Sequence, residues 1–497
     1  MCKVDFCRRI VAPFLMLIVL SGCGAEKQQI TETGMLCTYE SGASDTLVIG
    51  STLLLVDGAI SDGGLVVLSS GRIGDVGSFD ELATAFPEAS HLDCRGNTVL
   101  SPGWVNIHEH QAYSYAFPDP KLKAVYHHRE DWILGRNDML QLAVPDDQHY
   151  NPDVPMTHAL LSWVELRHLY AGTTTLGGSG AMRGLARNIG VPRNAEGADA
   201  AGYTFAVGTE VFPFTRNATE QFAGVCGVDG VSKLLAINDS NPELAFAPHV
   251  GEGRKSDCTA SAEIDAYLDY VAEQHTSRRR FAAVHAVATG PEQFARFAEL
   301  DVTLAWAPRS NLALYGETIA LQESQHHGVR LALGTDWSPS GSFNMLEEFS
   351  CARAVADKIG VALDDRDLWL MATHNAAYAV GIDEAVGQLK QGYYADIVLL
   401  RKQEGKDAYA AAVNASAADV AIVWLDGKPT FLESGMAAQM DLDSDCVSLT
   451  AEDKFLCADF ETVGITWEDI LVMTTDAVPI NGDTTGQAPC NVDHLGK

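Results

Sequence analysis

The chain has 497 residues, of which 47% are hydrophobic, and it carries a formal net charge of −32. This length and composition are sufficient for a large buried core, and they exclude a disordered or low-complexity polypeptide. The negative charge argues against nucleic acid as a partner and against electrostatic docking on anionic lipid, because both of these surfaces are polyanionic. The sequence therefore predicts a globular, well-hydrated protein.

Residues 1–22 have the pattern of an export signal. Basic residues precede the apolar run Ile10–Leu20, which is too short to span a bilayer. Small residues then lead into Cys23 and resemble the lipobox of bacterial lipoproteins, in which this cysteine is acylated and becomes the first residue. A cleaved signal followed by a chance cysteine is the alternative. We expect a signal peptide at 1–22, a polar tether at 23–44, and export to the periplasm or cell surface, with membrane contact only through a lipid at Cys23.

Two β-rich stretches flank the middle of the chain. Residues 45–100 contain short apolar runs separated by Gly and Asp, and the same pattern returns at 385–440. We expect these two stretches to pair with each other as the parts of one small sheet domain. Residues 441–497 form an acidic tail that contains cysteines, and no pattern in it indicates a role.

Residues 101–384 alternate apolar strands with amphipathic helices. Strands are predicted at 173–176, 202–212, 243–249, 280–287, 302–307 and 329–335, and helices at 157–170, 261–274, 291–300 and 345–356. Residues 185–200 have the least clear pattern, so that one strand is not placed. Alternation of strands and helices over this length predicts an α/β fold with a parallel sheet, and it suits a (β/α)8 TIM-like barrel.

Cysteine usage fits an exported protein. The sequence has eleven cysteines, and disulfides are permitted outside the cytoplasm. We expect at least one disulfide among Cys226, Cys258, Cys446, Cys457 and Cys490. The favoured pairs are Cys226–Cys258 and Cys446–Cys457. Cys351 lies in a helix-like run and is expected to be a buried thiol. No Cys-x-x-Cys motif occurs, which argues against a cysteine-based zinc site.

Four predicted strands end in residues that can bind a metal ion or move a proton. His108 and His110 follow the apolar run that begins at Ser101, and they share one face of a strand because residues i and i+2 point the same way. The other three strands end in His249 with Glu252 close behind, in His285, and in Asp336. A single histidine at a strand end is usually structural. Four such ends in one chain indicate a common site at the mouth of a barrel.

This order of residues resembles the amidohydrolase superfamily. The pattern is His-x-His, His-x-x-Glu, His and Asp, and it is accompanied by three similar segments at 101–106, 171–175 and 386–399. The resemblance covers about 45–440. It implies a TIM-like barrel together with a small β-sandwich built from the N-terminal and C-terminal flanking segments.

Two details indicate a branch within that superfamily. Glu252 lies three residues after His249, and residues 308–312 read Pro-Arg-Ser-Asn-Leu. Both features are similar to the mononuclear deaminases and chlorohydrolases, such as guanine deaminase, cytosine deaminase and the triazine hydrolases. Binuclear members use a carboxylated lysine at the end of the fourth strand, and no lysine between His110 and His249 ends a predicted strand. Glu210 is the alternative bridging carboxylate, although a loop-facing or hydrogen-bonded glutamate is favoured there.

The chain also departs from that branch. Residues 337–342 follow Asp336 where chlorohydrolases carry a Ser-Asn-Asn-type turn, and Trp306-Ala307 stands where His-Cys is usual. These segments shape the substrate pocket. The resemblance therefore does not transfer any particular substrate.

The expected site holds one divalent metal ion. Three imidazoles and one carboxylate, from His108, His110, His249 and Asp336, suit Zn²⁺, with Fe²⁺ or Mn²⁺ as alternatives. Glu252 is expected to carry the proton of the attacking water to the substrate nitrogen, and Asp336 to assist as a second base. His285 is expected to orient the water or to polarise the carbon under attack.

The favoured activity is hydrolysis of a non-peptide C–N bond, as a deaminase or amidohydrolase of a small cyclic or amidine-like compound. Binuclear hydrolysis of an amide, dipeptide or lactone with Glu210 is one alternative. A catalytically inactive surface-binding lipoprotein is another. The sequence leaves open whether the chain forms a homodimer.

Overall fold

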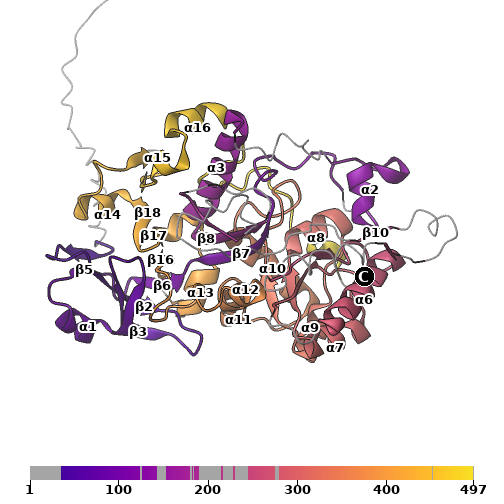
Figure 1. The fold of residues 1–497 in the computed structure, drawn as a ribbon, viewed down its shortest axis with the longest axis horizontal. Coiled ribbons are helices and arrows are strands. Elements are labelled where there is room, and N and C mark those ends of the chain that lie inside the picture. Colours follow the sequence, from indigo (N-terminus) through magenta and orange to yellow (C-terminus); the bar gives the residue numbers. More distant parts are fainter. Residues whose placement is uncertain are drawn as a thin grey trace, which may run out of the picture. The chain divides into compact units, whose positions relative to one another are not determined.

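The computed structural model describes most of the chain beyond its N-terminal segment (Figure 1). The described residues are 35–123, 126–142, 153–178, 182, 184–189, 214–216, 226, 228–229, 245–274, 279–403, 405–449 and 452–495. The predicted signal, Cys23, Glu210 and the predicted strand at 202–212 lie outside these residues. Within the described part, no helix has the length and hydropathy needed to cross a membrane.

One mixed sheet of eleven strands is built from both ends of the chain, and its indigo and orange strands can be followed in Figure 1. Its N-terminal strands are β1 (Thr38–Glu40), β2 (Leu47–Leu53), β3 (Ile60–Val67), β4 (Ile73–Ser78), β5 (Ser90–Asp93) and β6 (Thr98–Pro102). Its C-terminal strands are β16 (Ile397–Arg401), β17 (Val420–Leu425), β18 (Lys428–Glu433), β19 (Val447–Leu449) and β20 (Lys454–Leu456). The two sets meet where β6 and β16 pair antiparallel, with Pro102 opposite Ile397. The predicted pairing of the two flanking stretches is therefore confirmed.

Burial explains this junction. Leu100 of β6 and Leu399 of β16 are fully buried in the same apolar cluster, together with Trp424 of β17. Alternate residues of a strand point to one face, so these side chains form a continuous apolar surface across the two ends of the chain.

Parallel strands occupy the middle of the chain. One parallel sheet contains β7 (Trp104–Glu109), β8 (Thr173–Gly178) and β9 (Arg187–Asn188), and another contains β12 (His249–Val250), β13 (Ala282–His285), β14 (Thr303–Trp306) and β15 (Leu331–Leu333). A parallel bridge between Glu109 and Asp336 joins β7 to the residues that follow β15. The strands β7, β13 and β14 are buried along their whole length, as expected for parallel strands covered on both faces. Two short strands, β10 (Thr215–Arg216) and β11 (Val228–Asp229), pair only with each other among the described residues.

Helices follow most of these strands. They are α1 (Phe79–Ala85), α2 (Arg129–Leu134), α3 (Pro155–Tyr170), α6 (Cys258–Glu273), α7 (Pro291–Glu299), α8 (Pro308–Tyr315), α9 (Leu321–His327), α10 (Met345–Ile359), α11 (Asp365–Met371), α12 (His374–Ala379), α13 (Ala408–Val413), α14 (Ser434–Gln439), α15 (Phe460–Val463) and α16 (Trp467–Met473). Proline begins α3, α7 and α8, where its missing N–H costs nothing. The four predicted helices are confirmed as α3, α6, α7 and α10, with ends shifted by a few residues.

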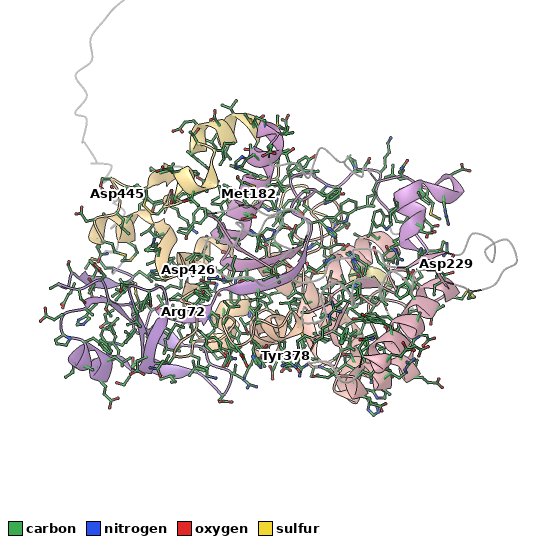
Figure 2. All side chains as sticks on the ribbon, viewed as in Figure 1. Arg72, Met182, Asp229, Tyr378, Asp426 and Asp445 are labelled. Atoms are coloured by element: carbon green, nitrogen blue, oxygen red, sulfur yellow. A yellow bond between two sulfur atoms is a disulfide. The ribbon has the colours of Figure 1, made fainter. Side chains whose placement is uncertain are left out.

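Ion pairs tie the parallel strands to the large sheet. The guanidinium of Arg187 in β9 is buried, and its Nε lies 2.6 Å from Oδ2 of Asp396. Its Nη2 lies 2.7 Å from Oδ1 of Asp426, which is labelled in Figure 2. An unpaired buried cation would be very unfavourable, so both carboxylates are needed to balance the charge of Arg187. They hold β9 against the start of β16 and against the turn between β17 and β18.

The described residues contain four disulfides. Cys226–Cys258 and Cys446–Cys457 confirm the two favoured pairs, and Cys37–Cys94 was not predicted. The prediction that Cys351 is a free buried thiol is wrong, because it is bonded to Cys490, 139 residues further along the chain. This bond fixes the C-terminal tail to α10, and the Nη1 of Arg309 donates to the backbone oxygen of Ala488 at 2.8 Å beside it.

Candidate metal centre and active site

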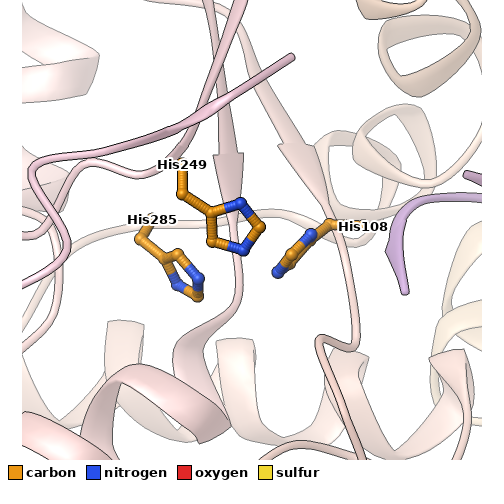
Figure 3. A group of neighbouring side chains, drawn as sticks. All are labelled: His108, His249 and His285. Atoms are coloured by element: carbon orange, nitrogen blue, oxygen red, sulfur yellow. The ribbon is translucent and has the colours of Figure 1, made fainter. Parts of the chain in front are cut away.

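Histidines from three parallel strands converge on one point. Figure 3 shows the rings of His108, His249 and His285 facing one another, and one nitrogen from each lies within 4.8 Å of the other two. His108, His110 and Asp336 form a second group that meets the same criterion. The two groups share His108, so the structure brings both sets of donors to one location.

The strand ends explain this convergence. β12 and β13 run parallel with Val250 opposite His285, so the end of each strand delivers a histidine to the same edge. His285 and Asp336 have positive φ angles of 66° and 57°, a conformation that residues other than glycine adopt at a cost of roughly 1 kcal/mol or more. Strain of this kind at two strand ends is typical of functional sites.

Gly334 allows the segment that follows β15 and carries Asp336 to approach His108. A Cβ atom on Gly334 would lie 2.6 Å from the Cβ of His108, which is closer than any ordinary contact. The backbone N–H of Asp336 donates to the His108 oxygen at 2.9 Å directly beside this point. Glycine at this position is therefore a condition for the arrangement of His108 and Asp336.

Asp336 is placed as a ligand or a base. Its Oδ1 lies 3.2 Å from Nε2 of His108 and 3.4 Å from Nε2 of His110, while its Oδ2 accepts a hydrogen bond from Ser310 at 2.5 Å. Burial alone would raise the pKa of Asp336, but the neighbouring imidazoles, above all His108, lower it below its usual range. The carboxylate is therefore ionised at neutral pH.

Two imidazoles of the cluster, those of His110 and His249, have lowered pKa values. Burial, and then the adjacent His108, lower the pKa of His110 to about 4. Burial, and then the nearby His108 and His285, place the pKa of His249 well below its usual range. Neutral imidazole is the form that binds a metal ion. The chemistry of the donor set, neutral nitrogen together with one ionised carboxylate, therefore fits a divalent cation.

Glu252 lies beside the cluster with His285. Its Oε1 is 3.8 Å from Nε2 of His285 and accepts a hydrogen bond from the Tyr315 hydroxyl at 2.7 Å. Burial raises the pKa of Glu252, as a group that must gain and lose a proton requires. The Nδ1 of His285 lies 2.9 Å from Oδ1 of Asn311, which can only accept, so Nδ1 carries a proton and Nε2 faces the site.

Glu109 supports the site from behind. It points to the opposite face of β7 from the flanking histidines, and it accepts hydrogen bonds from Ser114 and Thr335 and lies 3.1 Å from Nε2 of His168 in α3. Burial raises its pKa, but the charges of His168 and Arg167 outweigh burial and lower the pKa to about 2. This buried anion fixes β7 to α3 and to the segment that carries Asp336.

The structure brings the residues predicted for the site close together. Six residues lie together at the strand ends: His108, His110, His249, Glu252, His285 and Asp336. Glu210, the alternative bridging carboxylate, lies outside the described residues. Glu109 and Tyr315 also belong to this region, and the sequence patterns did not indicate either of them. Alternation along β7 could have indicated Glu109 as a buried residue of the outer face, but no pattern marked Tyr315.

An aromatic group adjoins the cluster. The ring of Tyr113 lies 6.1 Å from that of His110 and 5.8 Å from that of Trp337, the residue after Asp336. Trp337 in turn lies 5.3 Å from Trp132 of α2. The segment that departs from the deaminase pattern after Asp336 therefore contributes an aromatic side chain next to the candidate ligands.

Comparison with known proteins agrees with this geometry. A model of the amidohydrolase family matches residues 99–430. The guanine deaminase of Escherichia coli (strain K12) is 21% identical over 368 residues, which cover 68% of this chain and 81% of that protein. The 5-methylthioadenosine/S-adenosylhomocysteine deaminase of Thermodesulfovibrio yellowstonii is 25% identical over 428 residues, which cover 77% of this chain and 92% of that protein.

Solved structures show the same fold at low identity. A triazine hydrolase variant superimposes with a TM-score of 0.58 at 16% identity, over 86% of this chain and 99% of that chain. An adenosine deaminase from Xanthomonas campestris, solved with bound zinc, superimposes with a TM-score of 0.51 at 20% identity, over 80% of this chain and 98% of that chain.

Proposed function

Because this chain belongs to the amidohydrolase family, which its match over residues 99–430 establishes, we propose that it uses an activated water to deaminate or otherwise hydrolyse a small cyclic or amidine-like compound. It is a hydrolase that acts on carbon–nitrogen bonds other than peptide bonds. The observation that carries the finer proposal is Glu252, a buried carboxyl group beside a cluster of imidazoles that includes His285.

The proposed fold is a (β/α)8 TIM-like barrel with a small β-sandwich. The strand order β9-β8-β7, continued through the Glu109–Asp336 bridge into β15-β14-β13-β12, supports the barrel. The junction of β6 and β16 supports a second domain formed by 45–100 and 385–440, with the barrel at 101–384.

We assign the metal site to His108, His110, His249 and Asp336, which would hold one divalent ion. Zinc is favoured over iron or manganese because nitrogen ligands with one carboxylate suit it, and the zinc in the adenosine deaminase relative agrees. When bound, such an ion would supply Lewis acidity that lowers the pKa of a water molecule from 15.7 to about 7.

The protein side chains then move the proton. Glu252 takes a proton from the attacking water and delivers it to the nitrogen that leaves, as a buried carboxyl with a raised pKa can do. His285 presents Nε2 toward Glu252 and Asp336, where it orients the water or polarises the carbon under attack. Asp336, held by Ser310, is ionised and available as a second base.

We also propose that the protein is exported and anchored to the membrane by a lipid at Cys23. The four disulfides of the described residues support an oxidising compartment, because such bonds are rare in the cytosol. The negative charge supports a small-molecule substrate and argues against nucleic acid.

Two measurements test the proposed function. The purified, metal-loaded protein is screened against ring amines, ureas, N-acyl compounds and lactones, and its metal content is determined by elemental analysis. We expect turnover of a ring amine or amidine-like compound and about one ion per chain. Two ions per chain would favour the binuclear alternative with Glu210. Absence of both metal and turnover would favour the inactive binding protein.

Two variants separate the assigned roles. His108→Ala should lose both the metal and turnover. Glu252→Gln keeps the shape of the side chain and should retain the metal, while turnover falls by a factor on the order of 100 to 10,000, the usual size of general acid–base catalysis. Loss of metal from Glu252→Gln would show that Glu252 is a ligand and would contradict this assignment.

A further inference from the structure

Tyr315 connects Glu252 to α2 through two hydrogen bonds. Its hydroxyl oxygen lies 2.9 Å from Nε1 of Trp132 and 2.7 Å from Oε1 of Glu252. The indole N–H can only donate, so the tyrosine oxygen accepts there and its single proton points to Glu252. The side chain of Tyr315 is 1% exposed, so water does not compete for these bonds.

The two oxygens of Glu252 therefore differ. Oε1 receives the hydrogen bond from Tyr315, whereas Oε2 is buried and has no hydrogen-bond partner among the residues that the structure describes. A buried carboxylate oxygen without a partner is unfavourable, and such atoms are uncommon unless they have a function.

We propose that Tyr315, oriented by Trp132, is a positioning residue that holds Oε1 of Glu252 and leaves Oε2 as the oxygen that carries the proton. This inference rests on the proposed role of Glu252. Oε2 bonds to the proton as the O–H bond of the attacking water breaks. It then releases this proton to the nitrogen as the carbon–nitrogen bond breaks. Tyr315 keeps its own proton throughout, so the step needs no further donor or acceptor.

The hydrogen bond from Tyr315 also restricts rotation of the Glu252 carboxyl group. Rotation that exchanged Oε1 and Oε2 would break the buried hydrogen bond from Tyr315. The carboxyl group thus presents one oxygen in one direction, and a proton carrier held in this way stays within reach of both the water and the leaving nitrogen.

A rigid frame holds the partners of this contact. Arg129, three residues before Trp132 in α2, donates from its backbone N–H to the Glu252 backbone oxygen at 3.1 Å. Its guanidinium makes a two-point contact with Glu263 of α6, at 2.7 and 2.5 Å. Glu263 also accepts from the backbone N–H of Gly251 at 3.1 Å. The donor to Tyr315 and the loop that carries Glu252 are therefore bound to the same buried ion pair.

The test is a double-mutant cycle on the metal-loaded, full-length enzyme with a substrate from the screen. Tyr315→Phe removes only the hydroxyl. We expect kcat to fall about 10- to 100-fold, as for other residues that orient a reactive group, with KM and metal content unchanged. In a Glu252→Gln background the same substitution should cause no further loss, because Tyr315 acts only through Glu252.

Tyr267→Phe is the matched control. Tyr267 is also fully buried, and its hydroxyl donates to the Ala282 backbone oxygen at 2.8 Å outside the site. This variant should lose thermal stability and keep the wild-type kcat. If Tyr315→Phe does not fold, Trp132→Phe takes its place, since it frees the Tyr315 hydroxyl, and it should show a smaller loss with the same dependence on Glu252.

Wild-type kcat in Tyr315→Phe would overturn this inference, as would a loss of equal size in the Glu252→Gln background. Either result would leave the proposed function standing. Absence of turnover by the wild-type enzyme on every compound class would instead overturn the proposed function, and this inference with it.

Discussion

Gly334→Ala tests how closely two strand ends must approach to build the metal site. The added Cβ would lie 2.6 Å from the His108 Cβ and 3.1 Å from both the backbone nitrogen and oxygen of His108. Ordinary contacts between carbon atoms are about 3.5–4.0 Å, so one of the two segments must move by about 1 Å. Neither has room to move freely, because Gly334 donates to the Trp306 oxygen at 3.1 Å and His108 accepts from Asp336 at 2.9 Å.

A displacement of this size is large for a metal ligand. Ligand distances are normally held within about 0.2 Å, and a misplacement of about 1 Å near reacting groups can cost about 100-fold in rate. We therefore expect Gly334→Ala to bind less metal per chain and to lose about 100-fold in kcat/KM. Elemental analysis of the purified variant and steady-state kinetics on a substrate from the screen measure both effects.

Gly435→Ala is the control for this experiment. No atom lies within 4 Å of the position where its Cβ would be, and its φ is not in the left-handed region. This variant should keep the metal and turnover of the wild type. If Gly334→Ala also keeps both, the close approach of Gly334 does not determine the position of His108, and the reasoning is refuted.

Three further predictions concern the anchor, the tail and pH. Cys23→Ala should move the protein from the membrane fraction to the soluble fraction, and unchanged partitioning into a detergent phase would rule out the lipid anchor. Cys490→Ser should lower the free energy of unfolding in denaturant titrations by about 2–5 kcal/mol, because it releases the tail from Cys351; equal stability would contradict this. Burial raises the pKa of Glu348 from 4.5 to about 7, so the stability that it contributes is present below about pH 4.5 and is lost as the pH rises through 7. Between pH 4.5 and 8 the free energy of unfolding of the wild type should fall by up to about 3 kcal/mol relative to that of Glu348→Gln, as measured by denaturant titration. A difference in free energy of unfolding that does not vary with pH would argue against a raised pKa of Glu348.

The proximity of the candidate ligands could be predicted from the sequence, because each of them is marked by a local pattern. Each of His108, His249, His285 and Asp336 follows an apolar run, and parallel strands necessarily bring such ends to one edge. The pairing of the flanking stretches could also be predicted, since their apolar runs lack any other partner of the same kind. These conclusions depend on periodicity and order alone.

Other parts depend on which surfaces meet in space. Tyr315 lies in a buried helix next to Leu312 and Leu314, and nothing in that segment distinguishes a core tyrosine from one that reaches Glu252. Cys351 likewise has a helical pattern that favours burial, and its partner lies in a tail without a recognisable pattern. Contacts between residues far apart in the chain are set by packing, which single-sequence patterns do not encode.

The junction of β6 and β16 has a consequence for the order of folding. β6 ends at Pro102 and its partner strand begins at Ile397. One edge of β6 therefore stays unpaired while the ribosome adds nearly 300 residues. At typical rates of synthesis this takes roughly 15–60 s, during which the apolar face around Leu100 has no cover from the C-terminal strands. Such non-local pairing slows folding and exposes strand edges to other nascent chains. The N-terminal strands therefore stay without these partners until the last fifth of the polypeptide is synthesised.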